Sequence, residues 1–242
     1  MDDDLSHRLE AVQARIAQAA ARAGRDPAAV TLVAVSKTHP PAVIEAAYRL
    51  GLRCFGENRS AELAAKAPVL THLPDLQWHF IGALQTRQSG PVAAYAHCFE
   101  AVDRLKIAAR LERQRAEIGR ILPVLLEVNL SGEAAKSGFD CSHWEDDAAQ
   151  RDALQQAAAG IAALPHLQAQ GLMTLAPWDA PEALIRSVFA RTRRLAEWLR
   201  TVVPQADWTT LSMGMTDDFE IAIAEGATHV RIGRALFGAR LV

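Results

Sequence analysis

The stretch Val30-Thr31-Leu32-Val33-Ala34-Val35-Ser36-Lys37 is the most apolar strand-like run of the chain. It is short, rich in β-branched residues and apolar on both faces, which is typical of a buried parallel strand. Pro41 then suits the first turn of a helix, and Gly51 closes that helix after Leu50. A buried strand followed directly by a helix predicts a βα unit.

The same unit repeats along the chain, because helical patterns separate seven further short apolar runs. These runs lie at residues 53–56, 77–81, 97–102, 122–130, 168–175, 209–213 and 229–236. Eight alternating βα units predict a (β/α)8 TIM-type barrel over about residues 30–240, with an extra N-terminal helix over about residues 4–23. Residues 1–242 would then form a single domain. A doubly wound open sheet is the alternative, but the chain has no GxGxxG or GxxxxGK(S/T) motif.

Composition excludes several classes of function. Lys plus Arg number 26 and Asp plus Glu 28, and the resulting net charge of −2 argues against nucleic acid or an anionic membrane as a partner. Cys54, Cys98 and Cys141 lie far apart and form no CxxC or Cys/His ligand spacing, so we expect neither a disulfide framework nor a metal site. The acidic N-terminus does not resemble a signal peptide, and no run approaches about 18 apolar residues. We expect a cytoplasmic protein.

Lys37 stands out among the four lysines of the chain because it ends the most apolar strand. In a barrel, function gathers where the strands end. Lys66, Lys106 and Lys136 fall in helical or loop stretches, where we expect solvated surface positions. A lysine in a desolvated pocket keeps more of its free amine and can attack an aldehyde, whereas a lysine at the rim pairs with a carboxylate.

The other end of the chain contains a candidate phosphate site. Residues 211–217 leave the seventh predicted strand and residues 230–234 lie in the eighth, and barrel phosphate sites commonly form in the loops after these two strands. Ser212 offers a hydroxyl, Gly233 allows close backbone approach, and Arg231 supplies a fixed cation. One class of ligand would use both Lys37 and this phosphate site, namely an aldehyde that carries a phosphate. Pyridoxal 5′-phosphate (PLP) meets the description, and so does a phosphorylated sugar aldehyde bound by an aldolase.

Groups of residues along nearly the whole chain match the motifs of a known family. They are Leu32–Thr38, Phe55–Asn58, Trp78–Gly82 with Leu84-Gln85, Val128–Ser131 with Glu133, Lys136 and Gly138, Gly171–Met173, Leu211–Met215, and Val230–Gly233. With these motifs the chain resembles the pyridoxal phosphate homeostasis proteins, which are small barrels similar to the N-terminal domain of alanine racemases. The chain departs from the family pattern at Arg59, where an aromatic residue is usual, and at Thr86-Arg87-Gln88, where Asn-Lys often stands.

The resemblance implies a PLP site formed by six residues, Lys37, Asn58, Met173, Ser212, Arg231 and Gly233. It implies that Lys37 holds PLP as a Schiff base, that Ser212, Gly233 and nearby backbone hold the phosphate, and that Arg231 lies near the pyridine nitrogen. Because an arginine cannot protonate that nitrogen, the ring would be a weak electron sink and would support carbanion chemistry poorly.

We therefore expect a carrier that buffers PLP and delivers it to PLP-dependent apo-enzymes, a monomer with no catalytic residues. A PLP-dependent amino-acid racemase is the alternative, but it needs a second base opposite Lys37. Tyr48 and Tyr95 are expected within helices, and Cys54 and Cys98 at the starts of strands, far from the site. Lys136, in the loop after the fifth strand, is a candidate for accepting PLP transiently during release.

Overall fold

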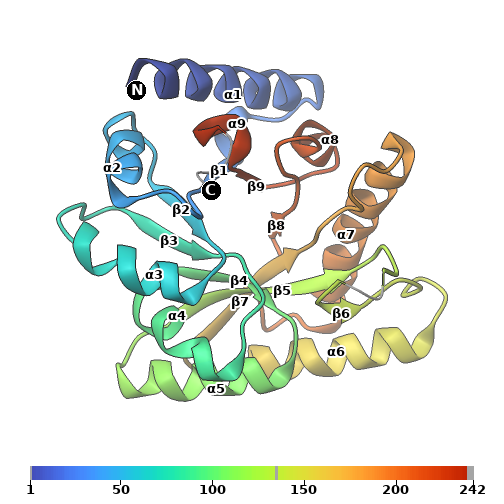
Figure 1. Cartoon of the computed structure of the whole chain (residues 1–242). Coiled ribbons are helices and arrows are strands. Elements are labelled where there is room, and N and C mark those ends of the chain that lie inside the picture. The colour runs from blue at the N-terminus through green and yellow to red at the C-terminus, as the bar shows by residue number, and fades with distance from the viewer. Residues whose placement is uncertain (1, 134–135, 239–242) are drawn as a thin grey trace.

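Eight parallel strands form where the apolar runs predict them, within residues 2–133 and 136–238, the part of the chain that the computed structural model describes. They are β1 (Thr31–Val35), β2 (Cys54–Glu57), β3 (Gln77–Phe80), β4 (Cys98–Val102), β5 (Leu122–Asn129), β7 (Leu167–Met173), β8 (Thr210–Ser212) and β9 (His229–Ile232). Neighbours follow the order β4-β3-β2-β1-β9-β8-β7-β5, and pairing of β4 with β5 closes the ring (Figure 1). The predicted closed barrel is confirmed, and the open sheet is wrong.

Close packing of β7 against β8 explains one glycine of the ring. Gly171 has φ +156°, and a Cβ at this position would lie 1.8 Å from the carbonyl oxygen of Thr210 on β8. The residue lies next to an irregularity in the pairing of β5 with β7, where Val124 pairs with Ala169 but Leu125 pairs with Gly171. Only glycine lets the two backbones approach this closely.

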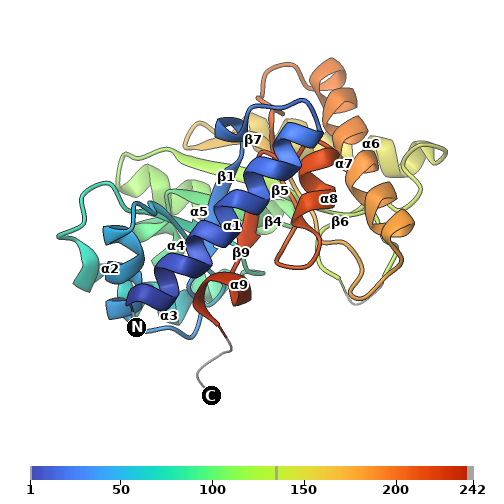
Figure 2. The same ribbon diagram turned by 90° about the horizontal axis from the view of Figure 1, so that it is seen from above.

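Helices surround the barrel, and the extra N-terminal helix packs on the outside of them. The helices are α1 (Asp2–Arg22), α2 (Pro41–Arg49), α3 (Ser60–Lys66), α4 (Ser89–Tyr95), α5 (Leu105–Glu117), α6 (Ala148–Ala162), α7 (Glu182–Val202), α8 (Phe219–Ala224) and α9 (Arg234–Phe237), with short 3-10 helices at Pro27–Ala29, Pro68–Leu70 and Thr86–Gln88. Figure 2 shows α1 lying across α8 and α9. Arg15 of α1 fixes this contact, since its guanidinium bonds Glu220 at 2.9 Å and stacks over the ring of Phe219.

The largest difference from the predicted bounds lies at the end of the last strand. The last strand ends at Ile232 rather than at residue 236, because Gly233 leaves the extended conformation and Arg234–Phe237 form a helical turn that buries Leu236. The predicted end of the barrel near residue 240 lies outside the described residues. A ninth, two-residue strand, β6 (Phe139–Asp140), pairs with the end of β5 and is too short to leave an apolar pattern in the sequence.

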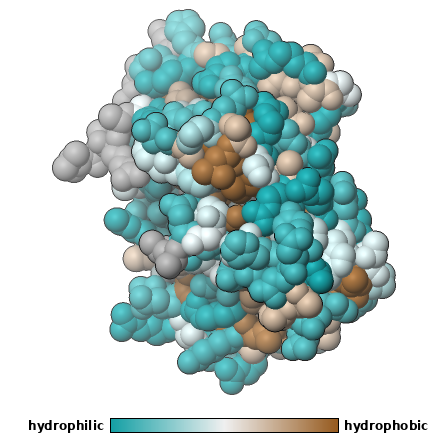
Figure 3. Space-filling model, turned by 90° about the vertical axis from the view of Figure 1, so that its right-hand side faces the viewer, coloured by the Kyte–Doolittle hydropathy of each residue, from teal (hydrophilic) through white to brown (hydrophobic). Residues whose placement is uncertain are grey.

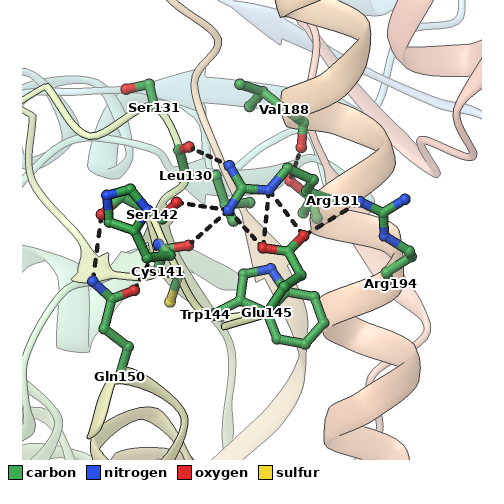
Figure 4. A network of polar contacts seen from close by, with 12 residues as sticks. Leu130, Ser131, Cys141, Ser142, Trp144, Glu145, Gln150, Val188, Arg191 and Arg194 are labelled. Atoms are coloured by element: carbon green, nitrogen blue, oxygen red, sulfur yellow. Dashed lines mark hydrogen bonds and ion pairs between the residues drawn. The ribbon is translucent and has the colours of Figure 1, made fainter. Parts of the chain in front are cut away.

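The segment between β5 and α6 is fastened to α7 by Arg191 (Figure 4). The Arg191 guanidinium donates to the carbonyl oxygens of Leu130 at 3.1 Å and Ser142 at 2.7 Å, and to the Glu145 carboxylate at 2.7 Å. Its side chain is 19% exposed, whereas the neighbouring Arg194 side chain is 53% exposed. A planar guanidinium reaches three acceptors at once, and a lysine ammonium does not reproduce this geometry.

Replacing Arg191 by lysine is therefore expected to lower the free energy of unfolding by about 1–3 kcal/mol, the scale of lost hydrogen bonds to a charged group. Arg194→Lys is the matched control and should change the unfolding free energy by less than about 0.5 kcal/mol, because its ion pair is exposed. Urea denaturation followed by circular dichroism measures both. Equal urea midpoints for the two variants would show that the hydrogen bonds of Arg191 do not stabilise the fold.

The outer surface suits helices that face water. The side of the molecule seen in Figure 3, on which α6 and α7 lie, is mainly hydrophilic and carries small separate apolar patches. Among the described helices, none combines the length and the hydropathy needed to cross a bilayer.

Candidate functional site

The predicted cofactor residues lie along five neighbouring strands, in the order β2-β1-β9-β8-β7. Asn58 directly follows β2, Lys37 lies just beyond β1, Arg231 lies in β9 with Gly233 just beyond it, Ser212 ends β8, and Met173 ends β7. Parallel strands end at the same face of a barrel. Residues from almost the whole length of the sequence therefore meet on one arc of the rim.

Lys37 lies half-buried on a turn that is fixed on both sides. The next residue, Thr38, has φ +67°, and its backbone N–H donates to the Glu62 carboxylate at 2.7 Å. The preceding residue, Ser36, is fully buried and its backbone N–H donates to the carbonyl of Gly56 on β2 at 3.0 Å. The amine of Lys37 is thus carried by a backbone that has little freedom to move.

A buried ion pair lies beside this turn. Lys66 Nζ bonds the Glu57 carboxylate at 2.8 Å, the Glu62 carboxylate at 2.9 Å and the backbone oxygen of Ser36 at 3.0 Å. Ser36 Oγ donates to the same Glu57 oxygen at 2.7 Å. Burial raises the pKa of Glu57, against the opposing effect of the Lys66 cation. The expectation that Lys66 is solvated is wrong: it is 6% exposed, because α3 brings its amine to the end of β1.

A hydrogen-bonded chain runs through the barrel interior from Arg231. Arg231 is 4% exposed, and it donates to Ser212 Oγ at 2.7 Å and to the backbone oxygen of Thr174 at 2.8 Å. Ser212 Oγ in turn donates to Glu100 at 2.5 Å. The other oxygen of Glu100 lies 2.6 Å from Nδ1 of His79. The Ser212 hydroxyl is therefore already shared between a cation and a carboxylate.

Glu100 is the central member of this chain and was not identified from the sequence. Burial alone would raise its pKa, but the hydrogen bond with His79 and the positive charges of His79 and Arg231 lower it to about 2. The residue stands alone as a charge in the buried strand Cys98–Val102. An acidic residue inside an otherwise apolar run could have indicated this role, because a buried charge needs a buried partner.

Two features of the rim concern Gly233 and Asn58. The backbone at Gly233 lies close to the end of β1, and Asn58 has an unsatisfied polar atom. A Cβ at Gly233 would lie 3.1 Å from the backbone oxygen of Val35, so a side chain there would crowd the end of β1. Asn58 Oδ1 is buried and makes no hydrogen bond within the described structure. Thr38 Oγ1 is also buried and also makes no hydrogen bond within the described structure. These features suit a small polar ligand near Lys37.

Lys136 lies at the same end of the barrel and is largely buried rather than solvated. Its Nζ donates to the backbone oxygen of Leu175 and to Ser131 Oγ, both at 3.2 Å, and pairs with Glu133. Its side chain is 19% exposed. The amine thus connects the loop after β5 to the loop after β7.

A cavity of about 220 Å³ opens beside the arc, between the loops after β7 and β8. Its lining includes Asp179, Asp217, Asp218 and the largely exposed Trp178, but none of the six predicted cofactor residues. Three carboxyl groups make this cavity a poor place for a phosphate. The arc at Lys37 and Gly233 is the better candidate site.

The chain is similar in sequence to known proteins over nearly its whole length. Residues 8–241 match the family model of the alanine racemase N-terminal domain. The chain is 47% identical over 236 residues to the pyridoxal phosphate homeostasis protein of Pseudomonas aeruginosa, covering 98% of this chain and 96% of that one. It is 42% identical over 243 residues to the protein of the same name in Escherichia coli, covering 98% and 97%.

Solved structures of other proteins are similar to this fold. PipY of Synechococcus elongatus, whose structure has been solved with PLP bound, has a TM-score of 0.81 and 37% identity, covering 97% of this chain and all of PipY (100%). Alanine racemase from Corynebacterium glutamicum shares the fold, with a TM-score of 0.70 at 17% identity, covering 98% of this chain and 62% of the racemase. The chain belongs to the family of pyridoxal phosphate homeostasis proteins.

Proposed function

We propose that this protein binds PLP through a Schiff base on Lys37 and buffers and delivers the cofactor in the cell without committed turnover. The observation that carries the proposal is the arc of strand ends, which joins Lys37 to Gly233 and Arg231 across the neighbouring strands β1 and β9. The names of the relatives and the PLP-bound structure of PipY support it. Borohydride reduction of the PLP-loaded protein, followed by peptide mapping, tests it.

The residues on the arc fit the cofactor. PLP supplies an aldehyde that reacts reversibly with amines. Lys37 offers such an amine on a restrained turn, and the unsatisfied Oδ1 of Asn58 is available as an acceptor. Arg231 has donors only, so an acceptor nitrogen that faces it stays unprotonated. Met173 is 1% exposed and pairs with Ser212, so it supplies an apolar group at the end of β7.

For the phosphate, we propose the backbone at Gly233 and in the loop after β8. Ser212 Oγ already accepts a hydrogen bond from Arg231 and donates one to Glu100. We therefore assign Ser212 the role of positioning the Arg231 side chain. Gly233 stands directly before the short helix α9, which matches the usual position of a barrel phosphate site.

The tyrosines and cysteines of the described structure are poorly placed to act as the second base of a racemase. Tyr48 on α2 is hydrogen-bonded to Asp75, and Tyr95 ends α4 on the outside of the barrel. Cys98 begins β4, at the end of the barrel opposite to Lys37. Cys141 lies near the rim, but burial raises its pKa to about 12, which keeps the thiol neutral and a poor base. A carrier is favoured for this reason.

The remaining expectations are part of the proposal. We propose that residues 1–242 act as one cytoplasmic, monomeric PLP-binding domain that supplies PLP-dependent apo-enzymes. We also propose that Lys136 accepts PLP transiently, after its amine leaves the carbonyl of Leu175 and the hydroxyl of Ser131.

Lys136→Ala is then expected to slow PLP transfer to an apo-enzyme several-fold while leaving equilibrium loading of Lys37 intact, because only the release path loses an amine. Appearance of activity in the recipient apo-enzyme measures the transfer rate. Lys106→Ala, at an exposed position on α5, is the control. Equal transfer rates for the two variants would remove Lys136 from the release path.

A further inference from the structure

A second polar cavity lies at the opposite end of the barrel, where the strands begin. Its volume is about 220 Å³, and it includes Cys54, His79, Cys98, Glu100 and His229 in its lining. None of the six proposed cofactor residues lines it. The carrier function described above does not require it.

Three of these side chains form a close, buried cluster of groups that can bind or orient a metal ion. A ring nitrogen of His79, the sulfur of Cys98 and a carboxylate oxygen of Glu100 all lie within 4.8 Å of one another, and all three residues are buried. His79 and Cys98 are direct partners in the pairing of β3 with β4, so the backbone fixes their proximity. The Nδ1 atom of His79 lies 2.6 Å from a Glu100 oxygen, and it is the donor of this hydrogen bond where Glu100 accepts as a carboxylate. A carboxylate that holds one ring nitrogen is the usual way in which a metal-binding histidine is oriented toward the metal through the other nitrogen.

A second thiol and a second imidazole border the same space. Cys54 lines the cavity together with Cys98 and His79. The ring of His229 lies 5.9 Å from that of His79, and its Nδ1 bonds Thr228 Oγ1 at 3.0 Å, which directs Nε2 elsewhere.

A disulfide is not the role of the two thiols. Cys54 and Cys98 stand on β2 and β4, with β3 between them. Two strand spacings separate their backbones by about 9–10 Å, beyond the Cα separation of about 7 Å that a disulfide tolerates. His79 lies on the intervening strand, between the strands of the two cysteines.

We propose that this cavity binds one thiophilic divalent cation, of which Zn²⁺ is the type, through Cys98 Sγ and His79 Nε2, with Cys54 and His229 completing a Cys₂His₂ set. Two thiolates and two imidazoles form the tetrahedral set that zinc favours, and calcium and magnesium prefer oxygen ligands instead. Two thiolates balance the charge of the cation, and Arg231 balances Glu100 through Ser212. Glu100 acts as a positioning residue for His79.

Cation binding must release protons. Both thiols lose theirs, and the Nε2 position of His79 must also be free of a proton. Affinity for the cation is therefore expected to rise with pH. Such a site could not be predicted from the sequence, because its ligands lie one to a strand, on β2, β3, β4 and β9, rather than at a short spacing.

Cobalt titration of the full-length, tag-free, reduced protein tests the proposal, because Co²⁺ reports its ligands by absorption. We expect one equivalent of Co²⁺ with the visible bands of a tetrahedral ion and a thiolate-to-cobalt charge-transfer band, and displacement by Zn²⁺. Cys98→Ser should remove the charge-transfer intensity of one sulfur and weaken binding by more than about 100-fold, beyond the 10–100-fold typical of an outer partner. Cys141→Ser, which removes a buried thiol at the other end of the barrel, is the matched control and should bind Co²⁺ as the wild type does.

A second measurement keeps the test informative if Cys98→Ser does not fold. Cys54 is partly exposed, so Cys54→Ser is expected to fold, and it too should lose charge-transfer intensity. Alkylation of Cys54 in the wild type should slow when Zn²⁺ is added and recover with chelator. Absence of Co²⁺ binding, a spectrum without a thiolate band, or unchanged binding in either cavity variant would overturn the proposal. PLP loading is measured on the same samples, so that failure of this site and failure of the carrier function are told apart.

Discussion

Replacing Lys37 by alanine is expected to give a folded protein that retains no PLP after gel filtration, whereas the wild type retains a full equivalent. The physical reason is that the other cofactor residues offer hydrogen bonds and one cation, but only Lys37 offers a covalent bond from the arc. The visible absorption of the loaded protein, before and after borohydride, measures the loss. Peptide mapping of the reduced wild type should find the pyridoxyl group mainly on Lys37.

Lys106→Ala is the control for this experiment, since Lys106 is exposed on α5 and should load normally. Lys136→Ala should also load normally. A pyridoxyl group on Lys66, or a main adduct on Lys136 in place of Lys37, would contradict the proposed anchor. Racemase and lyase assays on the loaded wild type separate a carrier from an enzyme, because appreciable turnover contradicts the carrier.

Replacing Lys66 by methionine is expected to lower the free energy of unfolding by about 3–5 kcal/mol, the cost of leaving one partner of a buried ion pair alone. Glu57 is fully buried and would keep only the hydroxyl of Ser36 as a donor. The same change should loosen the turn that carries Lys37, because Lys66 also bonds the backbone oxygen of Ser36. Urea denaturation measures the stability, and Lys106→Met is the exposed control.

The loss in Lys66→Met should depend on pH in a defined direction. Burial already raises the pKa of Glu57 above its ordinary value of 4.5, and removing the cation raises it further. A carboxyl whose pKa is higher in the folded state binds more protons when folded, so its destabilising effect is greatest at high pH and is relieved as pH falls through the folded pKa toward 4.5. The deficit relative to wild type should shrink between pH 8 and about pH 5. A deficit that stays constant over this range, or that Glu57→Gln in the same chain does not relieve, would show that lost packing is responsible.

The strands could be predicted from the sequence because buried parallel strands leave continuous apolar runs, and Thr31–Val35 is typical of them. The extra helix was visible for a related reason, since Leu5, Leu9, Val12 and Ile16 recur along one buried stripe. The end of β9 was not visible, because Leu236 and Phe237 are apolar in a helical turn as they would be in a strand. Periodicity over four residues does not separate these two conformations.

Lys37, Ser212, Arg231 and Gly233 could be proposed from the rule that strand ends meet, whereas Asn58 and Met173 came from the family resemblance. The hydrogen-bond partners of these residues could not be predicted. Ser212 bonds Glu100, which lies 112 residues away in the sequence, and local spacing carries no record of such a contact. Lys66 and Glu62 are four residues apart on α3, which is also the spacing of an ordinary surface pair. Only the packing of α3 against the end of β1 shows that this pair is buried.

The pairing of β1 with β9 has a consequence for how this protein folds. Thr31 and His229 are direct partners in this pair, so the first and last strands of the ring meet along one seam. Lys37 emerges from the ribosome early, but Gly233 joins it only after nearly the whole chain has been synthesised. Contacts between such distant segments are costly in chain entropy and form late. A ligand held by residues on both sides of the seam binds the closed ring and not an open one, and by mass action it stabilises the last step of folding.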